Sequence, residues 1–240
     1  PQKVEAVASS PTTGANLTFV QPVGNVRFGP QVMSVAFWLL TLYMMVHVLR
    51  INFTAGSISI QLEEMGDDAL FYVNLYILIF PLGFLSIPLV GWLLDRWRFV
   101  VGFEAINILA LITGLLLMIP WLPLQILTFV LFAGLRPFLF TAMYGFIGSR
   151  FGFTHYGKLV GICVGIAAVG SLSQTLLLYV TIFYLNGNFF LVNLFLNLIV
   201  LPLFPIAFVC AKYEPGTRWA WLKSQLESGS SSSSSFSSSS

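Results

Sequence analysis

Six apolar segments, each long enough to cross a lipid bilayer as a helix, follow one another along this sequence with short polar connections between them. A transmembrane helix needs about 20 predominantly apolar residues, and a helix satisfies all its backbone hydrogen bonds within lipid. Only 8% of the residues are charged, whereas an ordinary soluble domain carries about 25%. The sequence therefore predicts an all-α membrane protein, folded as a bundle of six transmembrane helices.

Polar ends flank the apolar part, so we expect one transmembrane domain over residues 30–212. Residues 1–29 lack a periodic apolar face, which predicts a flexible lead-in. Residues 213–240 form a tail that is almost entirely serine from residue 228, a composition that cannot build a core. The chain begins with proline rather than methionine, which indicates a fragment or a processed piece. The expected spans lie near residues 31–61, 69–93, 99–120, 122–149, 157–184 and 188–212.

The basic residues predict how these spans are oriented. Nine of the 11 Lys and Arg residues lie before the first span, in the second and fourth connections, or after the last span. The other connections hold none, and the first of them carries four acidic residues between positions 63 and 68. Because Lys and Arg mark cytoplasmic loops, we expect both termini in the cytoplasm. The plasma membrane is the first expectation, with an organelle membrane as the alternative.

A short charged turn joins the second and third spans and contains Gly91, Asp95, Arg96 and Arg98. A glycine four residues before an Asp-Arg pair would let two helix ends approach, and the opposite charges would fix the loop. This Gly-x-x-x-Asp-Arg pattern in a cytoplasmic loop resembles the major facilitator superfamily, where it follows the second span and, less regularly, the eighth. The residues after Asp95 and Arg96 depart from the fuller motif, which suits the second copy.

Residues 49–56 and 151–161 are similar to the large-neutral-amino-acid branch of that superfamily and to the related apicomplexan amino-acid transporters. The resemblance covers residues 30–212 and implies spans seven to twelve of a twelve-span carrier. It also implies two partners besides a small-molecule substrate. One is the lipid bilayer, and the other is an N-terminal six-span half or a second copy of the chain.

Arg136 is the leading candidate for substrate binding. It lies about 14 residues, or roughly 20 Å of helix, from either end of the fourth span. A charge at that depth costs at least about 2.5–3.5 kcal/mol and needs a partner or a watery cavity. Pro137 removes a backbone donor and so frees the carbonyl of Ala133. This combination suits a substrate carboxylate, and the alternative is a structural charge paired with the other half.

Phe140 and Tyr144 follow Arg136 at helical spacing and therefore share its face. They are candidates for an apolar pocket, although ordinary packing would give the same pattern. Gln174, near the middle of the fifth span, is a further candidate because its amide both donates and accepts hydrogen bonds.

Arg50 and Asn52 form a weaker pair of candidates near the outer end of the first span. By helix length Arg50 lies near the outer interface, where snorkelling toward water is the structural alternative to a binding role. Asn52 and the polar residues after it suit a cavity-facing helix end. His47 is a possible proton site or a packed histidine.

Several other residues suggest structural roles. Gly157, Gly161 and Gly165 recur every four residues and predict a smooth stripe for close helix packing. Glu104 is close enough to the second loop to pair with Arg96 or Arg98. Asn193 and Asn197 share one face of the last span, where they suit hydrogen bonds between helices.

The sequence offers no sign of an enzyme. Paired acids, a Ser-His pair and a metal cluster at membrane depth are all missing from it, and such groups carry catalysis. We therefore expect no catalytic residue, metal or other cofactor, and the absence of a Gly-x-x-x-x-Gly-Lys loop argues against ATP hydrolysis. A net charge of +2 gives no reason to expect a nucleic-acid partner.

The resemblance implies a secondary transporter that moves large neutral or cationic amino acids by alternating access. A carrier of another solute, such as a sugar or an organic anion, is the nearest alternative. A truncated six-span fragment without transport activity is the third.

Overall fold

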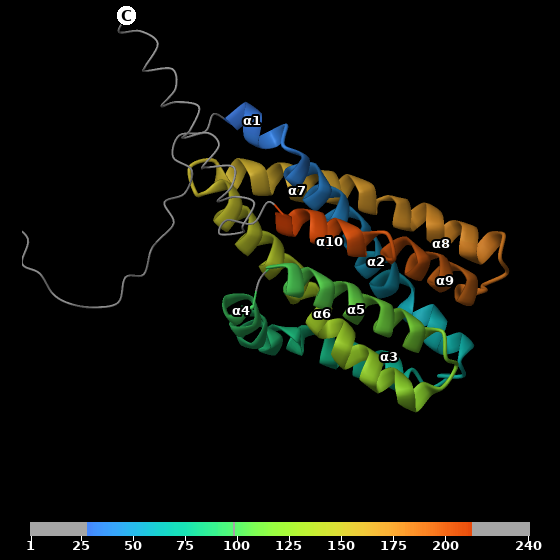
Figure 1. Cartoon of the computed structure of the whole chain (residues 1–240). Helices are drawn as coiled ribbons and strands as arrows, with labels where there is room; N and C mark the ends of the chain where they lie inside the picture. Colours follow the sequence, from blue (N-terminus) through green and yellow to red (C-terminus); the bar gives the residue numbers. More distant parts are fainter. Residues whose placement is uncertain (1–27, 98, 213–240) are drawn as a thin grey trace, which may run out of the picture.

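A computed structural model describes residues 28–97 and 99–212, which fold into helices joined by short turns, without a strand among them (Figure 1). Six helical stretches are long and apolar enough to cross a membrane. The predicted all-α, six-helix membrane bundle is thereby confirmed. Most of the expected lead-in, the serine-rich tail and Arg98 lie outside the described residues.

The described residues form ten α-helices and one 3-10 helix, and all of them except α1 belong to the six stretches. The first α-helix, α1, already begins at Phe28, so the lead-in ends two residues earlier than expected. In chain order the elements are α1 (Phe28–Val32), α2 (Val35–Glu64), α3 (Phe71–Ile79), η1 (Phe80–Ser86), α4 (Ile87–Arg96), α5 (Phe99–Leu117), α6 (Leu122–Phe151), α7 (Tyr156–Ser171), α8 (Ser173–Phe183), α9 (Phe189–Val200) and α10 (Leu203–Lys212).

The second, fifth and sixth stretches are interrupted, which the apolar pattern did not predict. In the second, Pro81 and Pro88 lie at the starts of η1 and α4. Proline has no backbone N–H and cannot complete a regular helix. The backbone therefore tightens into the 3-10 helix η1 between α3 and α4. The sixth stretch breaks at Leu201 and Pro202, between α9 and α10.

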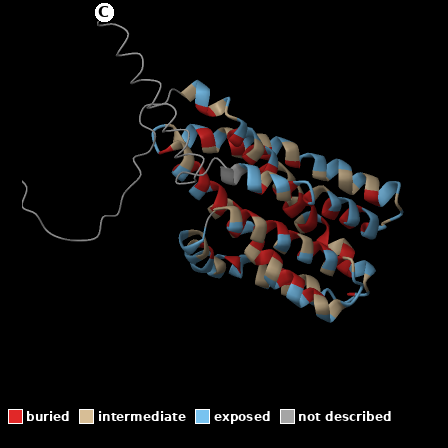
Figure 2. Ribbon diagram, in the orientation of Figure 1, coloured by how far each residue is buried: buried red, intermediate tan, exposed pale blue. Residues whose placement is uncertain are grey.

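The helices contribute unequally to the interior (Figure 2). Half of the most apolar window is buried in α2 and in α6, against 6% in the stretch from α3 to α4. α2 packs against α7, α5 packs against α6, and η1 packs against α6. The stretch from α3 to α4 therefore lies at the edge of the bundle and presents most of its surface outward.

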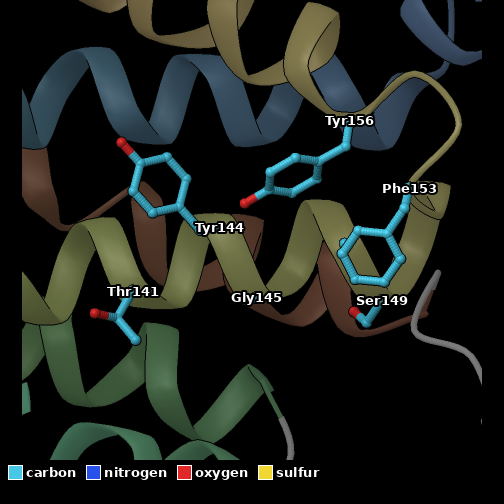
Figure 3. A pocket seen from close by; sticks show the side chains of 7 residues that line it. Thr141, Tyr144, Gly145, Ser149, Phe153 and Tyr156 are labelled. Atoms are coloured by element: carbon cyan, nitrogen blue, oxygen red, sulfur yellow. The ribbon is translucent and has the colours of Figure 1, made fainter.

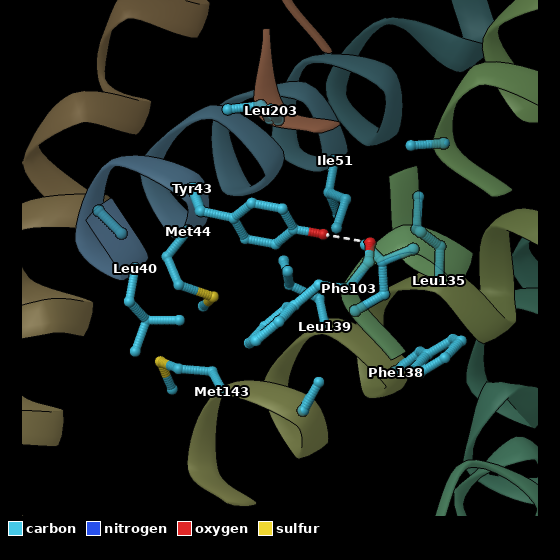
Figure 4. Packing of buried hydrophobic residues seen from close by; sticks show 14 of the residues in the cluster. Leu40, Tyr43, Met44, Ile51, Phe103, Leu135, Phe138, Leu139, Met143 and Leu203 are labelled. Atoms are coloured by element: carbon cyan, nitrogen blue, oxygen red, sulfur yellow. Dashed lines mark hydrogen bonds between the residues drawn. The ribbon is translucent and has the colours of Figure 1, made fainter. Parts of the chain in front are cut away.

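Side chains from α2, α5, α6 and α10 interlock in the interior (Figure 4). Tyr43 and Met44 from α2 meet Phe103 from α5 and Met143 from α6, and all four are at most 2% exposed. The Tyr43 hydroxyl donates to the Phe103 carbonyl oxygen at 2.9 Å, so its one polar atom is satisfied. Since lipid is as apolar as these side chains, close packing and such hydrogen bonds hold the helices together.

Apart from Arg50, Glu104 and Arg136, the charged residues that the structure describes lie toward the two ends of the bundle. α4 ends at Arg96, α6 has Arg150 in its last turn, and α7 carries Lys158 near its start. These helix ends lie together on the left of Figure 1. Glu63 and Glu64 close α2 at the opposite end.

Asp67, in the turn after α2, holds the start of α3. It is 4% exposed, and its two carboxylate oxygens accept from the backbone N–H groups of Phe71, Tyr72 and Val73 at 2.8–3.0 Å. These are N–H groups that the first turn of a helix leaves without partners. Asp67 thus caps these N–H groups from the turn before the N-cap residue Leu70, a role that the acidic cluster at residues 63–68 did not reveal.

The close packing expected of Gly157, Gly161 and Gly165 does not occur within the described residues. All three are exposed on α7, and a β-carbon added to any of them would meet no atom within 4 Å. The stripe faces outward because the core residues of α7, which are Leu159, Cys163 and Ala167, lie on the other side of this helix. Any helix that packs on the stripe must come from outside this part of the chain.

Candidate functional site

The region around Arg136 is built on an irregularity in α6. Pro137 lies inside this helix, so the carbonyl of Ala133 lacks its usual helix donor. η1 packs at this point, and a β-carbon added to Gly83 would overlap the Ala133 carbonyl oxygen. Two irregular backbone segments therefore touch directly, with only a glycine allowing the contact.

A groove of about 300 Å³ runs beside this contact, a volume at the small end of ligand pockets. Aromatic and aliphatic side chains make up most of its wall. The lining residues are Phe80, Pro81, Gly83, Phe84, Ile87, Ala133, Arg136, Pro137 and Phe140. Arg136 is the one charged member of this lining, so the groove combines apolar walls with one cation.

Arg136 is exposed on the outer side of α6. Among the described residues no carboxylate lies close enough to form an ion pair with it. A guanidinium offers five N–H donors in a planar fork that matches a carboxylate. The structure thus presents a cation near mid-span with its donors available to a ligand or a partner.

A second depression of about 550 Å³ lies farther along α6 (Figure 3). Tyr144 and Tyr156 place their rings near one another over α6, and Thr141 and Ser149 add hydroxyl groups to the lining. The ring of Tyr144 is 6.0 Å from that of Phe140. Phe140, which lines the groove, thus contacts a residue that lines this second depression.

Asn52 reaches the same neighbourhood from α2. It lines a small cavity of about 90 Å³ together with Phe140, Met44 and Ser171. Phe140 therefore borders both this cavity and the Arg136 groove. Arg136, Tyr144 and Asn52 thus line three separate hollows, each of which has Phe140 in its lining or beside it.

Gln174 is not among the residues that line these cavities. It lies on α8 just after the break at Leu172, half-buried. Its Oε1 atom is buried without a hydrogen-bond partner. The candidate from the fifth stretch thus stands apart from the Arg136 region.

Arg50 does not snorkel to the outer interface, which corrects the position expected from helix length. It is 4% exposed and turns inward, where Nη2 donates to the Ala110 carbonyl and to Asn197 Oδ1, the latter at 2.7 Å. Gly114 leaves the space for this arrangement, because a β-carbon there would overlap Nη2 and Oδ1. Arg50 thus links α2 to α5 and α9 by hydrogen bonds and does not line the groove.

Arg50 belongs to a buried polar seam along α2. His47 Nε2 lies 3.1 Å from Asn107 Oδ1 on α5, and Asn193 on α9 donates to Gln61 Oε1 at 2.9 Å. The interhelical hydrogen bonds expected of Asn193 and Asn197 are confirmed. Sequence reasoning missed Asn107 as a member of this seam. The polar residues of α2 recur every three or four positions, which is the spacing of one helix face, and this spacing could have indicated that α2 needs polar partners on its neighbours.

Glu104 does not pair with Arg96, and its other expected partner, Arg98, lies outside the described residues. Its Oε2 accepts from Asn107 Nδ2 at 3.4 Å, and its Oε1 is buried without a hydrogen-bond partner. The carboxylate turns toward the polar seam because Asn107 lies one turn farther along the same face of α5.

The turn motif is only partly described, since Arg98 falls in the gap. Asp95 and Arg96 are exposed at the end of α4, and no ion pair joins either of them to a described residue. A β-carbon on Gly91 would meet no atom within 4 Å, so the helix contact expected at this glycine is absent from the described part of the chain. The stretch from α3 to α4 lies at the bundle edge, and this placement leaves Gly91 without a neighbour.

Comparison with known proteins gives one distant relative. Over 172 residues the chain is 30% identical to Protein FMP42 of Saccharomyces cerevisiae (strain ATCC 204508 / S288c), and the match covers 68% of this chain. The match takes up 34% of the yeast protein, so the chain spans about a third of its length. No protein-family model and no solved structure matches. The chain is similar to one part of a longer protein.

Proposed function

We propose that this chain is one six-helix half of a secondary transporter of the major facilitator superfamily, and that the transporter carries small carboxylate-bearing solutes. Amino acids, first the large neutral ones, are the substrate class that the sequence resemblance implies. The observation that carries the proposal is Arg136, a cation near mid-span that forms no ion pair with a described residue and opens onto a groove between the 3-10 helix η1 and the proline-containing helix α6.

The position of Arg136 argues for a function because an unpaired charge there is costly. An ionisable side chain inside a membrane faces a bundle interior or a water-filled cavity. Arg136 points outward from the six helical stretches described, so its face must be covered by something other than lipid. A second six-helix unit packed on this face would enclose the groove and turn it into a cavity.

The lining of the groove suits the carboxylate and the apolar side chain of a large neutral amino acid. Arg136 supplies donors for a carboxylate, while Phe80, Phe84 and Phe140 supply an apolar wall for the side chain. The lining holds no acidic side chain. The substrate ammonium group would then be bound by the second unit.

The helix breaks provide a route to alternating access. In many transporters the substrate lies beside discontinuous helices at the interface of two repeats, which rock around it. Here η1 interrupts the second stretch directly beside Pro137 of α6. We propose that the helix ends on either side of these breaks move as the two halves rock, while Arg136 stays at the pivot.

The charge separation supports a topology with both termini in the cytoplasm. Arg96, Arg150 and Lys158 belong to helix ends on one side of the bundle, and Glu63 and Glu64 end α2 on the other. Basic residues stay on the cytoplasmic side. The compartment we propose is the plasma membrane.

An organic-anion carrier is the second candidate. The lone cation in the groove lining is the specific observation that favours it, because a carboxylate without an ammonium group needs no acidic partner. A sugar carrier has less support, since a sugar makes no use of the Arg136 charge.

Uptake competition tests the proposed substrate class. Cells that express the full-length protein would be given radiolabelled leucine together with an excess of neutral amino acids, simple monocarboxylates or hexoses. We expect neutral amino acids to suppress uptake, and cells without the protein give the background. Uptake suppressed by monocarboxylates alone would favour the organic-anion candidate, and the absence of any inhibition by amino acids would refute the amino-acid assignment.

A further inference from the structure

The closest backbone contact beside the Arg136 groove is the one between Gly83 and Ala133. Besides the overlap with the carbonyl oxygen, a β-carbon on Gly83 would lie 2.8 Å from the Ala133 carbonyl carbon and 3.4 Å from its Cα. These are backbone atoms of a helix, which cannot rotate aside as the end of a side chain can. The contact therefore fixes how closely η1 approaches α6.

Pro137 explains why the Ala133 oxygen can take part in this contact. In a regular helix this oxygen would accept from the backbone N–H of residue 137, and proline has none. The oxygen instead faces the Gly83 backbone on η1. Ser86, one turn on, donates its hydroxyl to the Gly83 carbonyl at 2.7 Å and lies against Gly134, whose added β-carbon would be 3.7 Å from Ser86 Cβ.

The groove begins at this contact and opens along both helices. Phe84 and Ile87 follow Gly83 at one and four positions, while Arg136 and Phe140 follow Ala133 at three and seven, and all four line the groove. The distance between the two sets of side chains is thus set where the two backbones meet.

We propose that Gly83 determines the width of the Arg136 groove and thereby the size of solute that the transporter accepts. This inference rests on the proposed function and assigns Gly83 a positioning role, since it acts through Arg136, Phe84 and Phe140. A methyl group at residue 83 forces η1 away from α6 and widens the groove. Small solutes then lose contact with one wall while they are held at Arg136, and large solutes keep both contacts.

Uptake selectivity tests the inference. Cells expressing the full-length protein, as wild type or Gly83→Ala, would be given radiolabelled leucine with alanine or phenylalanine as competitor. We expect Gly83→Ala to raise the inhibitory concentration of alanine, relative to that of phenylalanine, roughly tenfold, the effect of a changed methylene-sized contact. Gly56→Ala is the matched control, because a β-carbon at this glycine of α2 meets nothing within 4 Å, and it should leave the ratio unchanged. An unchanged ratio in Gly83→Ala would overturn the inference.

A thiol probe measures groove width without any substrate. Ile87 would be replaced by cysteine in full-length protein whose Cys163 is replaced by alanine and whose Cys210 is replaced by serine. We expect the rate of modification by methanethiosulfonate ethylsulfonate to increase several-fold when Gly83→Ala is added and to stay constant with Gly56→Ala. Equal rates would refute the widening. If no amino acid competed for uptake, the proposed function would fail, and this probe would still decide whether Gly83 sets the width.

Phe84→Ala covers the case in which Gly83→Ala does not reach the membrane. It enlarges the same groove without a backbone clash, because only a side chain of the wall is shortened. The same shift toward phenylalanine is expected, and an unchanged alanine-to-phenylalanine ratio would overturn the role of the groove width in selectivity.

Discussion

Replacing Gly114 with alanine perturbs a crowded polar contact inside the bundle. The added β-carbon would overlap Nη2 of Arg50 and Oδ1 of Asn197, and it would lie 2.8 Å from Asn197 Cγ. Arg50 is 4% exposed and Asn197 5%, so neither can turn into water. The guanidinium must leave its two acceptors, the Ala110 carbonyl and Asn197 Oδ1.

The expected loss follows from these two hydrogen bonds. Hydrogen bonds made by a charged group contribute about 1.5–3 kcal/mol each. Alanine offsets about 1 kcal/mol of this loss, because it has a higher helix propensity than glycine. Gly114→Ala should therefore lower the free energy of unfolding by about 2–5 kcal/mol.

Equilibrium unfolding of the full-length protein in detergent would measure this difference. The same substitution at Gly56 serves as control, since its β-carbon meets no atom within 4 Å, and it should change the free energy of unfolding by no more than about 1 kcal/mol. In an Arg50→Met background the clash with Nη2 is relieved and the one with Asn197 Oδ1 remains, so the cost of Gly114→Ala should fall by at least about 1 kcal/mol. Equal stabilities of Gly114→Ala and Gly56→Ala, or strict additivity with Arg50→Met, would refute the reasoning.

Two further substitutions test contacts that shape the turns. Asp67→Ala removes three backbone hydrogen bonds at the start of α3 and should cost about 2 kcal/mol, measured by detergent unfolding. The exposed neighbour Asp68 gives the matched control in Asp68→Ala, and similar losses in both variants would contradict the capping role. Gln125→Leu removes the amide that donates to the carbonyls of Leu116 and Ile119 at the end of α5, which should cost about 1–2 kcal/mol. Unchanged unfolding in this variant would show that these carbonyls find other donors.

Length and composition were enough to predict the six apolar helices, because a bilayer-length apolar segment has few other ways to satisfy its backbone. The breaks were harder to predict. Pro81 and Pro88 signal an irregular backbone, but whether a proline kinks a helix or starts a 3-10 turn depends on the neighbour packed against it. Here that neighbour is α6, approached at Gly83.

For the candidate residues, too, some properties could be predicted from the sequence and others could not. The depth of Arg136 followed from counting residues along one helix, and the structure places Phe140 and Tyr144 on the same face. The direction of Arg50 could not be counted in this way, because its partner Asn197 lies 147 residues farther along the chain. Helical spacing identified a face in each case, and only the assembled bundle shows what that face meets.

The glycine pattern in α7 illustrates the limit most clearly. Gly157, Gly161 and Gly165 give the same spacing whether a partner helix comes from this part of the chain or from elsewhere. The structure places them on the outside. Periodicity predicted the glycine stripe, but it could not predict which helix packs on it.

Transport by an Arg136 variant tests the central claim most directly. Initial rates of radiolabelled leucine uptake would be compared in proteoliposomes containing equal amounts of the full-length wild type, Arg136→Lys and Arg136→Ala. We expect Arg136→Ala to reduce uptake at least tenfold, equivalent to about 1.4 kcal/mol of lost binding. Arg136→Lys should retain part of the rate, because it keeps the charge but loses the bidentate geometry. Wild-type uptake by Arg136→Ala would contradict a carboxylate site at this residue.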